Sequence, residues 1–136
     1  MSELTLNQSY VSPLLEELPT WGKTTTIVIH LGSVFEFKGH FPSGSYSHGY
    51  FNLSSGGEGF EGHIRTSNIA SVGFQDKPHR GVQSLALLFN DKNGDNVFKV
   101  FVGREENGEL IQTQVLRFRQ LQELASQYAP PIQEPS

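Results

Sequence analysis

Apolar residues alternate with polar ones in several short runs, which is the pattern of half-buried β-strands. The run at 24–31 is rich in β-branched residues, and Gly32-Ser33 predicts a tight connection to the next strand. Loops rich in Gly, Pro and Ser separate the later runs, as at 39–45 and 54–57. The predicted strands of this kind are 24–31, 34–38, 48–53, 59–66 and 68–75.

Two more strands are expected beyond the break at 76–81. Residues 81–90 are apolar on both faces, which favours a central strand covered on both sides, although a buried helix fits nearly as well. Asn93-Gly94 predicts a hairpin turn, because both residues tolerate positive φ. The strand at 96–103 would then return antiparallel to 81–90.

Helices are predicted near both ends of the chain. After a polar lead-in at 1–9, Ser12 and Pro13 suit the start of a short helix that Pro19 ends. An apolar stripe with helical spacing predicts a long helix at 108–128, followed by a loose tail at 129–136. We therefore predict a single α+β domain over 1–136: an antiparallel sheet or open barrel of about seven to nine strands flanked by helices.

Composition excludes several classes of function. The net charge of −4 and pI near 5.7 argue against nucleic acid as a main partner. No apolar run approaches 18 residues, so no membrane span is expected, and the N-terminus lacks the features of a secretory signal. The chain has no cysteine, which excludes disulfides, iron–sulfur clusters and thiolate catalysis and is compatible with the cytosol.

Candidate chemistry concentrates at residues 60–65. A period of two places Phe60 and Ile64 on one face and Glu61, His63 and Arg65 on the other. An imidazole beside a guanidinium is suited to ligating a metal and pairing with an anion, but the same pattern fits an ordinary solvent-exposed face. The sequence lacks a P-loop, a dinucleotide-binding fingerprint, and the HExxH and GxSxG motifs.

Four segments together resemble one known family. WGKTTTIVIH (21–30), FPSGSYSHGYFNL (41–53), GFEGHI (59–64) and FKVFVGRE (98–105) resemble, in order and spacing, the HutX/ChuX family of cytosolic haem-utilisation carriers. The resemblance covers about residues 10–128. It implies a saddle-shaped antiparallel sheet flanked by helices and a homodimer similar in architecture to one HemS/ChuS monomer. It also implies a cytoplasmic location, b-type haem as cargo, and a haem-degrading partner that receives the cargo.

The resemblance also implies iron ligands. His63 matches the family histidine of the GHI segment that is implicated in haem binding. A second family histidine falls on Ile29, and this chain has His30 instead. One residue along a strand reverses the face, so either a β-bulge restores the direction or His30 is not an equivalent ligand. His48 and Tyr50 match the HGYFNL motif and are candidate pocket residues or alternative ligands.

Basic residues are candidates for the haem propionates. Lys99 and Arg104 match basic positions of the family's last strand, and Arg65 stands two residues from His63. Trp21 and the helix 108–128 are expected in the core or at the dimer seam.

Three functions remain open from the sequence. The first is a non-enzymatic haem carrier. The second is a haem-degrading or tetrapyrrole-modifying enzyme that takes its electrons from outside, because no flavin or nicotinamide fingerprint is present. The third is a β-rich module that binds another flat apolar ligand or a protein.

Overall fold

A computed structural model describes residues 4–127, which form two antiparallel sheets and two α-helices. Sheet A contains, in spatial order, β1 (Thr5–Asn7), β7 (Ser71–His79), β8 (Val82–Asn90), β9 (Asn96–Val102), β2 (Lys23–His30) and β3 (Ser33–His40). Sheet B contains β4 (Ser43–Ser47), β5 (Tyr50–Ser54) and β6 (Gly62–Ile64). The helices are α1 (Val11–Glu17) and α2 (Gln112–Gln127), with 3-10 turns at Gln8–Tyr10, Leu18–Trp21 and Thr66–Asn68. The predicted α+β class is confirmed.

Three of the hairpins are closed by the same kind of two-residue turn. Each turn has a non-glycine residue followed by glycine, and both residues have positive φ. This conformation matches the right-handed twist of the strands, and glycine adopts it without steric cost. The turns are Leu31-Gly32 between β2 and β3, His48-Gly49 between β4 and β5, and Arg80-Gly81 between β7 and β8.

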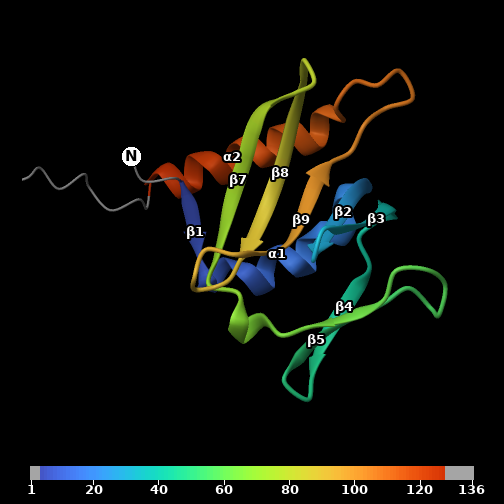
Figure 1. Cartoon of the computed structure of the whole chain (residues 1–136), viewed down its shortest axis with the longest axis vertical. Coiled ribbons are helices and arrows are strands. Elements are labelled where there is room, and N and C mark those ends of the chain that lie inside the picture. Colours follow the sequence, from blue (N-terminus) through green and yellow to red (C-terminus); the bar gives the residue numbers. More distant parts are fainter. Residues whose placement is uncertain (1–3, 128–136) are drawn as a thin grey trace, which may run out of the picture.

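One core lies between the inner face of sheet A, the apolar face of sheet B and the helices. Figure 1 shows α2 crossing behind β7 and β8. Phe118 of α2 meets Phe74 of β7 edge-to-face, with ring centroids 5.4 Å apart. The buried apolar residues include Leu14, Leu15 and Leu18 near α1, Leu85, Leu87 and Phe89 of β8, Phe98 and Val100 of β9, Phe51 and Leu53 of β5, and Phe118 and Leu121 of α2. Trp21 joins this core, as expected from the sequence.

A buried glutamine joins α2 to the end of β9 and the start of β2 in sheet A. The Gln114 Oε1 atom accepts from the Gly103 N–H at 2.8 Å, and Nε2 donates to the carbonyl oxygens of Trp21 (3.0 Å) and Lys23 (2.7 Å). The backbone approach is close: a Cβ added to Gly103 would lie 2.0 Å from the Lys23 carbonyl oxygen. Any side chain at position 103 would clash with the Lys23 backbone, so this position requires glycine.

Several predicted boundaries were wrong. The predicted lead-in contains β1, because Thr5–Asn7 pair with β7. The break at 76–81 is mostly strand, because β7 runs to His79 and only Arg80 and Gly81 turn. The loop at 39–45 contains the end of β3 and the start of β4.

The remaining differences concern shorter elements. The strand predicted at 59–66 is only Gly62–Ile64, and a 3-10 turn precedes β7. Helix α1 begins at Val11, before Ser12 and Pro13, and no side chain caps it. Helix α2 begins at Gln112, after Gly108 adopts a φ of 88°. Tyr128 and the predicted tail at 129–136 lie outside the described residues.

Candidate functional site

The polar face of sheet B gathers the central candidate residues. In the β5–β6 ladder Asn52 lies directly opposite His63, and Phe51 lies opposite Ile64. Phe51 and Leu53 are buried, whereas Asn52 and Tyr50 are half-buried and His63 is exposed. The predicted separation of Ile64 from His63 on β6 is confirmed, because period-two alternation sends one side chain toward the core and the next outward.

His63 is held at one of its two ring nitrogens. Its Nδ1 atom lies 2.6 Å from Asn52 Oδ1, within hydrogen-bond distance. The Tyr50 ring meets the imidazole edge-to-face, with centroids 6.0 Å apart. The described contacts therefore fix the ring orientation through Nδ1 and leave Nε2 as the candidate ligand atom.

Arg65 is fixed beside the same tyrosine. Its guanidinium donates to Tyr50 Oη at 2.5 Å and lies over the Tyr50 ring, 4.5 Å from the centroid. One nitrogen of the fork is used in that bond, and the side chain is exposed, so the remaining N–H groups can meet an anion. The structure thus brings His63, Tyr50 and Arg65 together.

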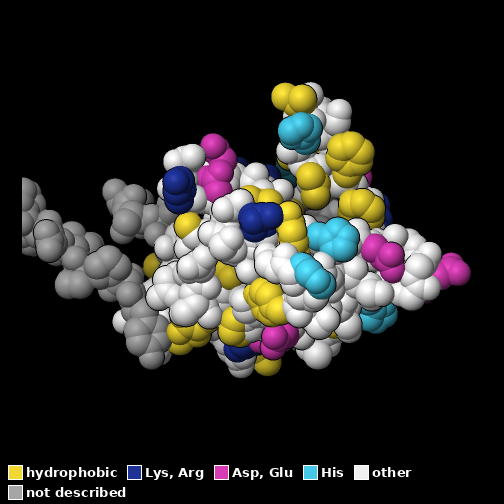
Figure 2. All heavy atoms as spheres, turned by 90° about the horizontal axis from the view of Figure 1, so that it is seen from below, with side chains coloured by type: hydrophobic (Ala, Val, Ile, Leu, Met, Phe, Trp, Pro, Cys, Tyr) yellow, Lys and Arg dark blue, Asp and Glu magenta, His cyan; other side chains and the backbone are white. Residues whose placement is uncertain are grey.

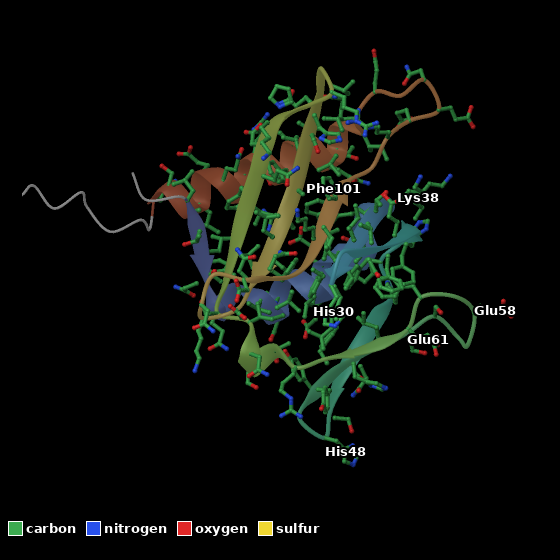
Figure 3. The ribbon with its side chains drawn as sticks, in the orientation of Figure 1. His30, Lys38, His48, Glu58, Glu61 and Phe101 are labelled. Atoms are coloured by element: carbon green, nitrogen blue, oxygen red, sulfur yellow. The ribbon has the colours of Figure 1, made fainter. Side chains whose placement is uncertain are left out.

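A glycine-rich loop next to β6 is organised by Glu61. The carboxylate accepts from the backbone N–H groups of Gly57 (2.7 Å) and Ser55 (3.1 Å). These bonds, that from Gly57 first, lower the pKa of the Glu61 carboxyl below its ordinary value. The carboxylate therefore stays charged at neutral pH and holds the loop that leads to His63. Figure 3 shows Glu61 and Glu58 in this loop, at the side of sheet B.

His30 lies on the sheet face that looks toward sheet B. The β2–β3 register is unbroken from the Lys23–His40 pair to the His30–Ser33 pair, so the β-bulge considered from the sequence is absent. His30 therefore shares a face with Phe35 and Phe37, and Ile29 points to the opposite face. Phe37 stacks on Phe60 with centroids 4.6 Å apart, which links this hairpin to the segment before β6.

The end of the β2–β3 hairpin is unusually apolar for an exposed surface. Phe35 is 52% exposed and Phe37 39% exposed, and Leu31 at the turn is 92% exposed. Figure 2 shows hydrophobic side chains on a projection with histidine among them, beside a surface that also carries histidine side chains. An exposed aromatic surface that shares its face with the His30 imidazole suits a flat apolar ligand that carries a metal ion.

His48 does not occupy the strand position expected from the sequence. It sits in the β4–β5 turn with φ 57°, and its Nδ1 atom pairs with Ser47 Oγ at 2.6 Å. Figure 3 shows it at the tip of this hairpin. The sequence pattern missed this because it does not reveal that His48-Gly49 closes a turn before the strand begins.

Lys99 and Arg104 lie on sheet A instead of beside His63. Lys99 pairs with Ile27 and Leu88 on the outer face, the face opposite the helices. Arg104 donates to the carbonyl oxygens of Gly108 (2.9 Å) and Gln83 (2.6 Å). It lines an outer-face groove of about 540 Å³ together with Lys23, Lys38, Ile27 and Phe101. Figure 3 marks Lys38 and Phe101 on this sheet.

Two residues of the site were missed as functional candidates. The contact of Asn52 with His63 depends on the β5–β6 register, which the sequence does not reveal. Phe60 was only placed on one face with Ile64, and its stacking with the exposed Phe37 connects the β2–β3 hairpin to the segment before β6. The sequence offered one signal for Asn52: two positions from Tyr50 in the same strand, it shares a face with that candidate residue.

Comparisons with known proteins agree on one family. The sequence profile of the family described as "Haem utilisation ChuX/HutX" matches residues 4–121. The "Intracellular heme transport protein HutX" of Vibrio cholerae serotype O1 is 41% identical over 115 residues, which is 85% of this chain and 60% of that protein. The chain therefore spans about three fifths of the length of this curated relative.

Solved structures agree with the sequence matches. A crystal structure of ChuX superposes with a TM-score of 0.83 at 30% identity, covering 93% of this chain and 79% of that one. A second, titled "Structure of the Heme Binding Protein ChuX", gives a TM-score of 0.81 at 30% identity, covering 92% and 78%. With a family match over most of its length and the same fold as ChuX, this chain belongs to the haem utilisation ChuX/HutX family.

Proposed function

We propose that this protein is an intracellular haem-binding carrier that holds b-type haem as cargo and passes it to a haem-degrading partner. The observation that carries the proposal is the placement of His63, fixed through Nδ1, beside Tyr50 and Arg65 on an exposed face of sheet B. The relatives support it: HutX is named an intracellular heme transport protein and ChuX a heme-binding protein. No helix among residues 4–127 is long and apolar enough to cross a membrane.

Different residues are proposed to bind the haem iron and the propionates. His63 Nε2 is the proposed axial donor to the haem iron, because neutral imidazole is a common haem ligand. Arg65 is the residue that we propose to pair with a propionate. We prefer Arg65 to Lys99 and Arg104, because Lys99 lies on β9 and Arg104 binds the carbonyl oxygen of Gln83 in β8, away from the His63 cluster. Because β2 has no bulge, His30 is not equivalent to the second family histidine. It faces sheet B from the apolar end of the hairpin and is a candidate second ligand in its own right, and Tyr50 is the alternative. An exposed site suits a carrier, since the cargo must leave.

Titration of the apo protein with hemin should shift the Soret band and saturate at one haem per subunit. The expected reason is ligation of the iron by His63, which is exposed and needs no rearrangement of the core. A His79→Ala variant should titrate like the wild type, because His79 is an exposed histidine of β7 in the other sheet. A Soret shift that grows without saturation would contradict the carrier function and favour a module that binds another ligand.

The same complex separates a carrier from an enzyme. On addition of ascorbate in air, a carrier keeps its Soret band, whereas a haem-degrading enzyme loses it and forms biliverdin-like products. We expect the band to persist, because the matched relatives are named a heme transport protein and a heme-binding protein. Loss of the band at a rate above that of free hemin would establish the enzyme.

We further propose that the carrier is a homodimer. The helices cover only the inner face of sheet A, so no element among residues 4–127 covers the apolar side chains of the outer face. These outer-face residues are Ile27, Ile29, Val34, Leu88, Val97 and Phe101. An isologous pairing of two such faces would bury them. Trp21 is less suited to the seam, because it is already buried in the core.

Light scattering should give a mass near twice the 15.1 kDa of the chain. Phe101→Glu is expected to shift the mass toward one chain, because it replaces an apolar side chain of the proposed seam with a charged one. Leu116→Glu is the matched control, since Leu116 is an exposed apolar residue of α2. A monomeric wild type at micromolar concentration, with and without hemin, would contradict the dimer.

A further inference from the structure

We propose that Asn52 is a positioning residue that sets the tautomer and direction of His63, so that the unprotonated Nε2 atom faces outward. The part of this inference that concerns iron rests on the proposed haem-carrier function, and the part that concerns the tautomer does not. The inference rests on the contacts of Asn52 Nδ2 with backbone carbonyl oxygens and of Asn52 Oδ1 with His63.

The first step is the orientation of the amide. Asn52 Nδ2 lies 3.3 Å from the Ser45 carbonyl oxygen, 3.2 Å from that of Ser47 and 3.3 Å from that of Tyr50. Carbonyl oxygens only accept hydrogen bonds, so the amide NH₂ group belongs on their side. The opposite amide orientation would set Oδ1 against three acceptors. The surrounding backbone of β4 and β5 therefore determines which amide atom faces His63.

The second step is the proton on the imidazole. Because NH₂ faces the carbonyls, Oδ1 is the atom that lies 2.6 Å from His63 Nδ1. An amide oxygen cannot donate, so Nδ1 must carry the hydrogen of this bond. In a neutral imidazole the other nitrogen then holds an unshared pair. The Asn52–His63 hydrogen bond therefore selects the tautomer that leaves Nε2 available as a ligand.

The third step is rigidity. Asn52 and His63 are direct partners in the β5–β6 ladder, so their backbones are fixed relative to each other. Asn52 is half-buried, and its amide is tied to a second strand, β4. A ligating histidine that donates its other ring N–H to an acceptor is held in orientation and becomes more basic. Removal of such an acceptor commonly lowers metal affinity by about 10–100-fold. Asn52 thus prepares the ligand before any cargo arrives.

The tautomer is tested on the apo protein, without haem. Long-range ¹H–¹⁵N correlation of the histidine rings, recorded well above the imidazole titration range, should show His63 as the Nδ1–H form in the wild type. Asn52→Ala should shift His63 toward the Nε2–H form. Asn52→Asp removes the NH₂ contacts to the carbonyls but keeps an acceptor, so it should retain Nδ1–H.

These variants keep the inference open to contradiction. If His63 in the wild type is the Nε2–H form, or if Asn52→Ala leaves the tautomer unchanged, the inference is overturned. If Asn52→Asp behaves like Asn52→Ala, an acceptor without the NH₂ contacts to the carbonyls does not hold Nδ1–H, and the assignment of the tautomer to the acceptor alone is overturned. His79 in the same spectra reports whether any change is confined to His63.

A second measurement uses the hemin-loaded protein. Asn52→Ala should weaken hemin binding by roughly 10–100-fold and lower the iron–histidine stretching frequency of the ferrous form, whereas Asn52→Asp should raise that frequency. A purely structural role would change affinity without moving the frequency in opposite directions. Failure of the wild type to bind hemin would overturn the haem part, and the apo tautomer would still test Asn52 itself.

Discussion

Replacement of His63 by alanine is expected to weaken hemin binding by about 100-fold and to change the ferric absorption spectrum. The loss of one axial bond accounts for the spectral change, and a 100-fold change corresponds to about 2.8 kcal/mol. Because His63 is exposed and contributes little to the core, the variant should fold normally. Hemin titration followed in the Soret region gives both the affinity and the spectrum.

Two further histidine variants make this result specific. His79→Ala should bind hemin as the wild type does. His30→Ala should convert a low-spin ferric spectrum to high-spin if His30 supplies the second axial ligand, and should leave the spectrum unchanged if water or Tyr50 completes the iron. A His63→Ala protein with wild-type affinity and spectrum would contradict the site assignment, although not the family or the fold.

Replacement of Gln114 by methionine is expected to reduce the free energy of unfolding by about 2–4 kcal/mol. Methionine preserves the length of the side chain but leaves the Gly103 N–H and the carbonyl oxygens of Trp21 and Lys23 without their partner. Gln114 is only 1% exposed, so water cannot easily replace its amide. Each unsatisfied buried backbone group costs about 1–3 kcal/mol, partly recovered by relaxation.

Urea denaturation followed by circular dichroism measures this loss. Gln120→Met is the matched control, because Gln120 is exposed on the same helix and accepts only one solvent-accessible bond from Arg117. We expect the control to change stability by less than about 0.5 kcal/mol. Equal stabilities of the two variants would show that the Gln114 bonds do not hold α2 to the sheet.

Local pattern predicted much of the fold because alternation and turn residues act over a few positions. The strands near 24–31, 81–90 and 96–103 and the helix over 112–127 follow from such patterns. The edge strand β1 was missed because its three residues pair with β7, some 65 positions away, and carry little pattern of their own. The division into two sheets was likewise unpredictable, because it depends on which strands pair.

The site was predictable in its residue types and not in its contacts. His63 and Arg65 were found through alternation and family resemblance, and the structure places both beside Tyr50. The direction of His30 required the register of β2 with β3, and the role of Asn52 required the register of β5 with β6. Lys99 and Arg104 were linked to the site by family position alone, and sheet pairing separates them from it.

The edge position of β3 has a consequence for the behaviour of the protein at high concentration. This strand ends sheet A and presents Val34, Phe35 and Phe37, which are 57%, 52% and 39% exposed. An open edge with such side chains can recruit strands of other chains and so promote aggregation. Glu36 and Lys38 interrupt the apolar run with charges that resist this pairing. If the cargo covers the two phenylalanines, the empty protein is the form most prone to aggregate, and loading protects it.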